Sequence, residues 1–181
     1  MIYKNSKPNL KALEKNIVDT IKESQLKLGF TPNPVTLFYP LESLNLLTGA
    51  DLSMSEMTAA ISAYASDILS GLSCNVFEDK IGVVVSAESV RAIHENTEAS
   101  AFLTEFIAAV KEGCTMEKAK AIFKKYSDNA VLEDMDDDEF DVLAYFPDGE
   151  PDAYKYCLAN DLGGITYHRF TQQDYENIFE N

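Results

Sequence analysis

The chain has 181 residues, of which 46% are hydrophobic and 10% aromatic, and its formal net charge is −15. This length suits one domain with a sizeable core, and the apolar content excludes disorder for most of the chain. The negative charge argues against direct binding to nucleic acid or to anionic lipid, because the phosphates of both would be repelled.

The N-terminal segment lacks the apolar stretch of a secretory signal, and Asp67 and Lys80 interrupt the richest apolar regions before any reaches membrane-spanning length. The cysteines, Cys74, Cys114 and Cys157, form no CxxC pair and are odd in number, which indicates reduced thiols. We therefore expect a cytoplasmic protein with no membrane association.

The first expected helix covers residues 10–28, where apolar residues recur at three- and four-residue steps and Gly29 follows as a C-cap. Its outer face is basic, so the helix is a candidate to lie against the acidic C-terminal part of the chain. The lysines of this face are Lys4, Lys7, Lys11, Lys15, Lys22 and Lys27.

The segment 32–40 contains three prolines and alternating apolar residues, which indicate a short edge strand over 35–39. A short helical turn is expected over 44–47, and it should end at Gly49. The sequence thus predicts a strand followed at once by a short helix.

Ser53 and Glu56 have the spacing of a capping box, and the apolar stripe after them predicts a largely buried helix over 54–72. A charged turn over 78–80 separates two apolar runs rich in β-branched residues. This pattern favours a β-hairpin within 74–86.

Ser86 is expected to cap a long or kinked helical segment that ends at Gly113. Thr115 then opens a further helix that extends to Tyr126. The first two-thirds of the chain is therefore predicted to be mainly helical.

Three strands are expected after the acidic stretch, over 140–146, 154–158 and 165–170, because turn residues separate three apolar runs. Thr171 and Asp174 can then cap a last helix that covers one face of the sheet. These elements describe a three-stranded antiparallel meander with a terminal helix.

The predicted fold class is α+β, in a single domain over 1–181. It consists of a helical part (1–127), an acidic connector (128–139) and a sheet-plus-helix part (140–181) packed together. The 74–86 hairpin is a candidate to extend the C-terminal sheet.

Three tripeptides within residues 17–49 carry a resemblance: Leu28-Gly29-Phe30, Phe38-Tyr39-Pro40 and Ser43-Leu44-Asn45. The segment resembles the opening of a small, uncharacterised family of proteins from gut-dwelling Firmicutes. Because that family has no assigned activity, the resemblance implies no catalytic or binding residues. It weakens the case for a familiar enzyme.

The negative charge is regional, because residues 128–181 carry fifteen Asp and Glu against Lys155 and Arg169, a net of −13. The densest run, 133–141, has seven carboxylates in nine residues, and a basic partner would relieve their mutual repulsion. The alternative is that the run serves solubility and internal pairing with the first helix. The predicted binding residues are Asp134, Asp136, Asp137, Asp138, Glu139 and Asp141.

The same run has acidic residues at alternate positions from Asp134, as in an EF-hand calcium loop. However, the sixth position is Glu139 where the loop needs Gly, and the twelfth is Tyr145 where it needs Glu. We therefore predict no metal site, and no motif for a cofactor is present.

His94 and His168 are the only histidines, and neither has metal-ligand spacing. Cys157 and His168, on neighbouring expected strands, are a candidate thiolate pair. The leading hypothesis is a non-catalytic protein-binding or regulatory module that acts on a basic partner. The alternatives are a small hydrolase or transferase with a site between the helical part and the sheet, and an oligomeric structural protein joined through the 36–39 edge. The sequence does not specify the oligomeric state.

Overall fold

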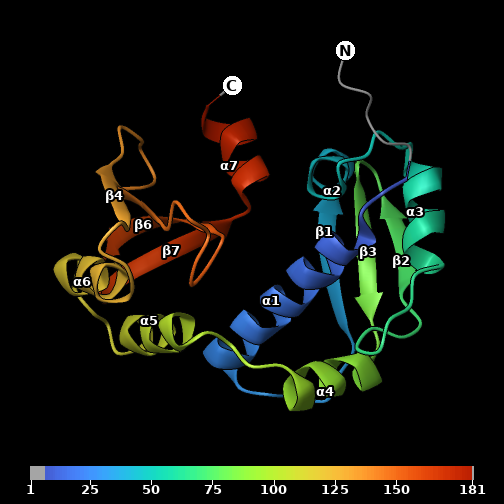
Figure 1. The fold of residues 1–181 in the computed structure, drawn as a ribbon, viewed down its shortest axis with the longest axis horizontal. Coiled ribbons are helices and arrows are strands. Elements are labelled where there is room, and N and C mark those ends of the chain that lie inside the picture. The colour runs from blue at the N-terminus through green and yellow to red at the C-terminus, as the bar shows by residue number, and fades with distance from the viewer. Residues whose placement is uncertain (1–6, 181) are drawn as a thin grey trace. The chain divides into compact units, whose positions relative to one another are not determined.

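The computed structural model describes residues 7–180, and the chain divides into two compact units, residues 1–98 and 99–181. Each unit contains helices and its own antiparallel sheet, which confirms the predicted α+β class (Figure 1). Within residues 7–180, no helix combines the length and the apolar character that crossing a bilayer requires. The boundary between the units at Glu98 differs from the predicted division at residue 127.

The sheet of unit 1 has three antiparallel strands in the order β1-β3-β2. The predicted edge strand and the predicted hairpin are both confirmed. The hairpin pairs with the edge strand and does not extend the C-terminal sheet, which corrects that expectation. The elements of unit 1 are α1 (Leu10–Leu28), β1 (Val35–Pro40), α2 (Leu41–Thr48), α3 (Met54–Ser62), β2 (Ser73–Phe77), β3 (Lys80–Val85) and α4 (Ala87–Asn96).

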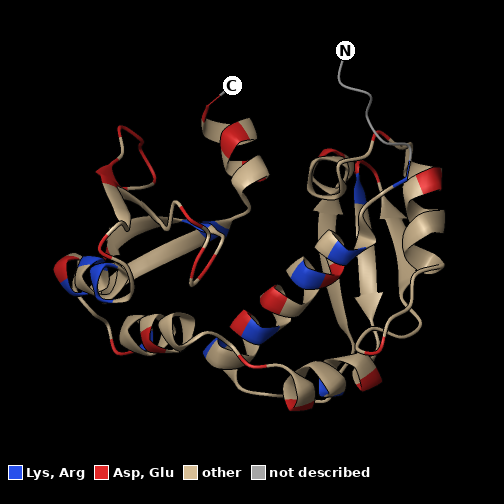
Figure 2. Ribbon diagram, in the orientation of Figure 1, with Lys and Arg blue, Asp and Glu red and all other residues tan. Residues whose placement is uncertain are grey.

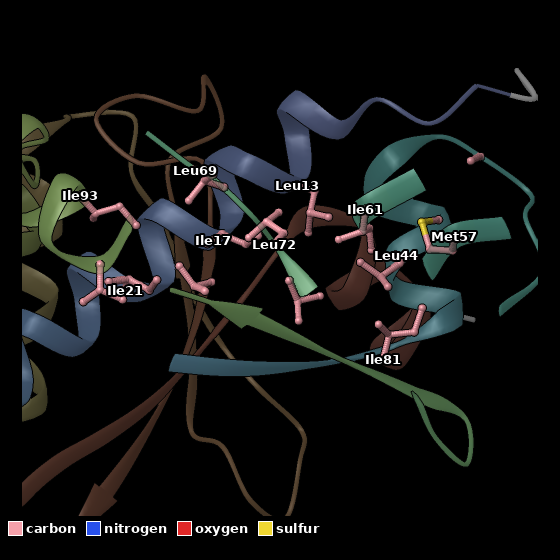
Figure 3. Close-up of a cluster of buried hydrophobic side chains, with 14 residues drawn as sticks. Leu13, Ile17, Ile21, Leu44, Met57, Ile61, Leu69, Leu72, Ile81 and Ile93 are labelled. Carbon is pink, nitrogen blue, oxygen red and sulfur yellow. The ribbon is translucent and has the colours of Figure 1, made fainter. Parts of the chain in front are cut away.

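One face of this sheet carries the core of unit 1 (Figure 3). Ile81 and Val83 of β3 pack there with Ile17 of α1, Leu44 of α2 and Ile61 of α3, and all five side chains are fully buried. Residues of alternate strand positions point to the opposite face, where exposed Phe38 and Phe77 make an edge-to-face contact.

The predicted helix over 54–72 ends at Ser62, ten residues earlier than expected. Its start is correct, because Ser53 and Glu56 form the capping box. Beyond the helix, the Ser66 hydroxyl accepts hydrogen bonds from the backbone N–H groups of Ile68 and Leu69, which stabilise a local turn. The apolar stripe was therefore a correct guide to burial but a wrong guide to helix length.

The predicted long helix from Ser86 to Gly113 is two helices, α4 and α5 (Ala101–Lys111). Thr97 has extended backbone angles and ends α4, and the Ser100 hydroxyl caps α5 by accepting from the N–H of Leu103. The boundary between the two units lies in this interruption.

Unit 2 is built on a four-stranded antiparallel sheet in the order β4-β5-β6-β7. The predicted meander had three strands; the fourth, β4, lies inside the segment that was predicted as an acidic connector. The elements of unit 2 after α5 are α6 (Met116–Tyr126), β4 (Val131–Asp134), β5 (Val142–Tyr145), β6 (Lys155–Asp161), β7 (Gly164–Phe170) and α7 (Gln172–Phe179).

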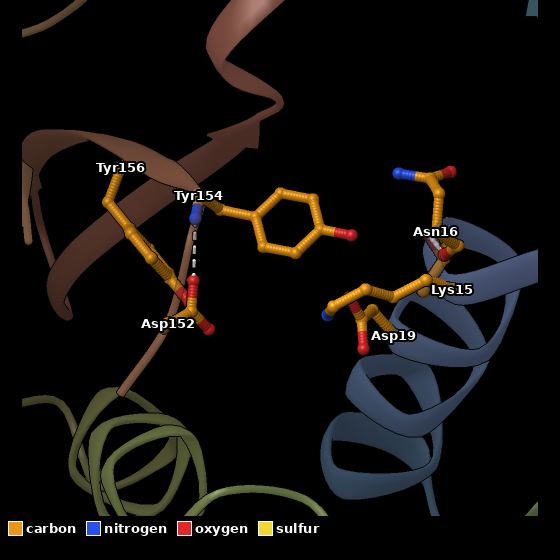
Figure 4. Close-up of polar contacts among 7 residues, drawn as sticks. Lys15, Asn16, Asp19, Asp152, Tyr154 and Tyr156 are labelled. Atoms are coloured by element: carbon orange, nitrogen blue, oxygen red, sulfur yellow. Dashed lines mark hydrogen bonds and ion pairs between the residues drawn. The ribbon is translucent and has the colours of Figure 1, made fainter. Parts of the chain in front are cut away.

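The two faces of this sheet are covered by different helices. Aromatic residues of α5 and α6, including Phe102 and Phe123, pack on the face that carries Tyr156. The hydroxyl of the buried Tyr156 donates to an Asp152 oxygen at 2.9 Å, and the other Asp152 oxygen accepts from the N–H of Tyr154 (Figure 4). The opposite face carries Leu143 and Cys157 under Tyr175 of α7, as expected for the terminal helix.

Backbone lies directly against backbone where the β6–β7 turn meets the end of α5. A Cβ atom at Gly113 would lie 2.3 Å from the carbonyl oxygen of Gly163, and one at Gly164 would lie 2.6 Å from the carbonyl carbon of Gly113. Only residues without a side chain allow this approach. The contact fixes the β6–β7 turn against the helical layer of unit 2.

Two lysines of the predicted basic face form ion pairs along α1 itself. Lys15 pairs with Asp19 at 2.6 Å (Figure 4), and Lys27 pairs with Glu23 at 2.8 Å. Lys4 lies outside the described residues. The predicted pairing of this face with the acidic C-terminal part stays a prediction.

Candidate functional site

The predicted acidic binding residues lie on the β4–β5 hairpin of unit 2, and Figure 2 shows much of its loop in red. The N–H of Met135 donates to the carbonyl oxygen of Asp141 at 2.9 Å and closes the loop. One Asp137 oxygen accepts from the N–H groups of Glu139 and Phe140, at 2.8 and 3.0 Å. Asp137 therefore shapes the loop from within.

Asp141 ties the end of the loop to β6. Its N–H donates to the carbonyl oxygen of Leu158 at 2.8 Å. Its carboxylate accepts from both the N–H and the side-chain amide of Asn160, at 2.7 and 3.0 Å. Beside it, Phe140 is buried against α7. These bonds and this side chain give the loop a defined conformation.

The six predicted residues therefore divide into two groups. All six lie at exposed positions. Asp137 and Asp141 accept backbone hydrogen bonds with their carboxylates, whereas the other four present theirs to solvent. Of these four, Asp134 lies 3.5 Å from Lys120 of α6, and its side chain is 89% exposed, so the pair adds little stability. The four are Asp134, Asp136, Asp138 and Glu139.

The resulting field is strongly negative because unit 2 carries eighteen acidic residues against seven basic ones, a net of −11. Unit 1 carries the remaining −4. Among residues 7–180, no group of three or more His, Cys, Asp or Glu side chains is arranged to hold a metal ion. What the loop offers is negative charge at fixed positions.

Cys157 and His168, the candidate thiolate pair, are direct cross-strand partners on the face that α7 covers. Burial raises the pKa of the Cys157 thiol to about 12, and the negative charge of Asp137 adds to this effect. His168 is exposed and has Phe140 and Phe170 as ring neighbours. The pair is adjacent as predicted, but the thiol is protonated near neutral pH and is a weak nucleophile.

Lys155 is a buried residue that the sequence did not single out. Its ammonium lies 4.2 Å from the ring centroid of Tyr175 and 4.9 Å from that of Tyr145. Glu180, just after α7, approaches it to 3.6 Å. These contacts stabilise the buried ammonium of Lys155 beneath α7. The only signal in the sequence was its place beside the apolar run Tyr156 to Leu158.

The other histidine, His94, lies on α4 in unit 1 and stacks on Phe30 with ring centroids 4.0 Å apart. Its side chain is exposed.

Comparison with protein families matches residues 10–179 to a domain of unknown function described from E. rectale, DUF3877. The chain belongs to the DUF3877 family. The predicted resemblance to a family from gut Firmicutes is thus confirmed. No curated protein and no solved structure matches the chain. Membership in DUF3877 assigns no residue roles, so those proposed below depend on geometry and charge.

Cys157 should be the least reactive of the three cysteines of this DUF3877 chain. In the native protein at pH 8, iodoacetamide should modify half-buried Cys74 before Cys157, because Cys157 is fully buried and its pKa is raised to about 12. Mass spectrometry of the peptides measures the order. In urea the difference should disappear, and native Cys157 modified as fast as a free thiol would contradict the prediction.

Because the pKa of Cys157 is raised, the stability of the fold should decrease at alkaline pH. The contribution of Cys157 is fully present below the ordinary thiol pKa of 9.0 and is lost as the pH rises toward about 12, because only the unfolded thiol ionises in that window.

Proposed function

We propose that this DUF3877 chain is a non-catalytic protein-binding or regulatory module whose acidic β4–β5 hairpin contacts a basic partner protein. The observation that supports the proposal is that the carboxylates of the loop have two different roles. Asp137 and Asp141 use their carboxylates to shape the backbone, which leaves Asp134, Asp136 and Asp138, together with Glu139, exposed at defined positions.

Charge complementarity is the physical basis of this binding. Four exposed carboxylates within six residues repel one another, and cationic side chains of a partner reduce that repulsion while they gain attraction from unit 2 as a whole. Such interactions are screened over about 8 Å at physiological ionic strength. Binding should therefore be salt-sensitive and fast.

The test is a pull-down from native lysate at low and moderate salt, with a variant that neutralises the four predicted binding residues whose carboxylates do not shape the loop backbone. Asp134→Asn, Asp136→Asn, Asp138→Asn and Glu139→Gln together change the net charge from −15 to −11 while Asp137 and Asp141 keep the loop intact. A partner bound by the wild type in a salt-dependent way should be lost by this variant.

A matched control changes the net charge equally at other exposed sites of unit 2. It carries Glu117→Gln, Asp128→Asn, Asp148→Asn and Glu150→Gln. This control should retain the partner, because its hairpin is unchanged. Equal binding by wild type and hairpin variant, or equal loss in both variants, would sink the proposal of a local site.

A further inference from the structure

Strand β2 is an open edge of the unit 1 sheet. Among residues 7–180 it pairs only with β3, and its sequence, Ser-Cys-Asn-Val-Phe over 73–77, contains neither charge nor proline. Natural edge strands are commonly protected by lysine, proline, bulges or a covering element, because their unpaired backbone accepts other strands. The opposite edge, β1, has Pro40 at its end and Pro34 just before its start. Strand β2 therefore lacks the lysine or proline that commonly protects such an edge.

The register identifies the backbone groups that β2 offers. Phe77 and Lys80 close the two-residue turn of the hairpin, and Asn75 pairs with Gly82 two positions away. Hydrogen-bonded and open positions alternate along an antiparallel pair. The N–H and C=O groups of Cys74 and Val76 therefore point away from β3, toward the open edge.

A groove runs between this edge and α3, which lies beside β2 (Figure 1). Its volume is about 600 Å³, and its walls include Ser55, Ala59 and Ser62 of α3 and Val76 of β2. Its described lining residues are all uncharged, and Val76 is 52% exposed. Small side chains at one-turn intervals along α3 leave room for an extended chain beside β2.

The charges around the groove differ at its two ends. The Ser62 side chain, near the end of α3, lies close to the Cys74 thiol, near the start of β2, so the helix and the strand run in opposite directions. The first turn of α3, which contains Glu56, is therefore near the hairpin turn, which contains Glu78 and Asp79. Lys80 offsets one of these three carboxylates, and the Ser62 end has no charged residue lining it.

We propose that the α3–β2 groove binds an extended, uncharged segment of a partner protein by strand addition, with a basic residue preceding that segment. Antiparallel pairing, the stabler arrangement, places the N-terminal end of the incoming segment beside Phe77, where the acidic end of the groove receives the basic residue. Alternate small or apolar side chains of the segment face Val76 and Ala59.

The geometry favours a segment from another protein over a second copy of this chain. Antiparallel pairing of two β2 edges puts both copies of α3 on the same side of the joined sheet. The second α3 would then compete for the groove that the first one borders. A single extended segment of a partner protein has no helix that would compete for the groove. This surface and the acidic β4–β5 hairpin consist of different residues in different units, so each proposal can be tested without the other.

The test is a titration of the full-length, ¹⁵N-labelled chain with two peptides of the same composition. The first is acetyl-Arg-Thr-Val-Thr-Val-Thr-amide, and the second, acetyl-Thr-Val-Thr-Val-Thr-Arg-amide, places the basic residue at the opposite end. The first should shift the amide signals of Cys74 and Val76 and those of α3. The second should bind about two- to fivefold more weakly, because one exposed charge interaction is misplaced.

Two variants test the assignment of the groove and its acidic end. Val76→Lys should abolish binding of both peptides, whereas Thr36→Lys makes the same charge change on the exposed face of β1 and should not. Glu56→Gln with Glu78→Gln should remove the difference between the peptides. Melting temperatures close to that of the wild type verify that each variant is folded.

Several results would overturn the proposal. These are unchanged Cys74 and Val76 signals at millimolar peptide, equal affinity of the two peptides for the wild type, and binding that survives Val76→Lys. A dimer of the free protein that Val76→Lys disrupts would assign the edge to a second copy instead.

Discussion

Replacing Phe102 with alanine should lower the free energy of unfolding by about 3–5 kcal/mol, the usual cost of deleting a buried aromatic side chain. Phe102 is fully buried in unit 2, and its ring lies among those of five others, with centroids 4.8 to 5.8 Å away. These rings come from α5, α6, β6 and the residue after β5, so the cavity borders both the helices and the sheet. The five neighbours are Phe106, Phe123, Tyr126, Phe146 and Tyr156.

Urea denaturation followed by circular dichroism measures this loss, and Phe38→Ala is its control. Phe38 is the same residue type on the open face of the unit 1 sheet and is 57% exposed, so its removal should cost about 1 kcal/mol or less. If Phe102→Ala costs no more than Phe38→Ala, the aromatic cluster does not stabilise unit 2 as described.

Replacing Gly164 with alanine should destabilise the protein by more than about 2 kcal/mol, through a clash and through backbone strain. The added Cβ would lie 2.6 Å from the carbonyl carbon of Gly113 and 2.9 Å from the carbonyl oxygen of Cys114. These are backbone atoms, so no rotamer change relieves the overlap. The φ angle of Gly164, +137°, is also one that residues with a side chain rarely adopt.

The neighbouring Gly163 provides a matched control for this substitution. A Cβ at Gly163 would have no atom within 4 Å, so Gly163→Ala should change stability by about 0.5 kcal/mol or less. Thermal unfolding of the two variants side by side makes the comparison. Equal melting temperatures would mean that the β6–β7 turn does not lie against the end of α5.

Elements defined by short-range signals were predictable from the sequence. Ser53 with Glu56 marked the start of α3, Gly49 the end of α2, and the charged turn the β2–β3 hairpin. In each case the residues that decide the conformation lie within about four positions of one another. Local hydrogen bonding and backbone preference then suffice.

Periodicity failed where a loop has the same burial pattern as a helix. Leu69 and Leu72 continue the stripe of α3 and are buried, but they reach the core from a loop that Ser66 organises. Apolar spacing reports which side chains face the core; it does not report the backbone path between them. For the same reason, the sequence predicted one long helix where the structure has α4 and α5, which are interrupted between Thr97 and Ser100.

The pairing of strands that are distant in the chain could not be predicted either, because no local sequence signal determines which strands pair. β1 and β3 are separated by α2, α3 and β2 in the chain, yet they pair along six residues each. β4 was missed because Val131 and Leu132 are its only apolar residues. Its place in the sheet depends on pairing with β5.

The acidic hairpin was located from composition, but the roles of its individual carboxylates were not. Asp137 and Asp138 are adjacent and identical in the sequence, and only the structure shows that Asp137 accepts two backbone hydrogen bonds. Likewise, the partnership of Asp141 with Asn160 joins residues nineteen positions apart. Charge density predicted the region; hydrogen-bond geometry was needed to select residues for substitution.

The division at Glu98 bears on how the chain folds during synthesis. Every strand of the unit 1 sheet precedes this residue, and every strand of the unit 2 sheet follows it, so neither sheet waits for a strand from the other. A ribosome adds about 5–20 residues per second. Unit 1 therefore has seconds in which to close its sheet before the last strand of unit 2 leaves the exit tunnel, so its strands can pair with one another before those of unit 2 are available to compete.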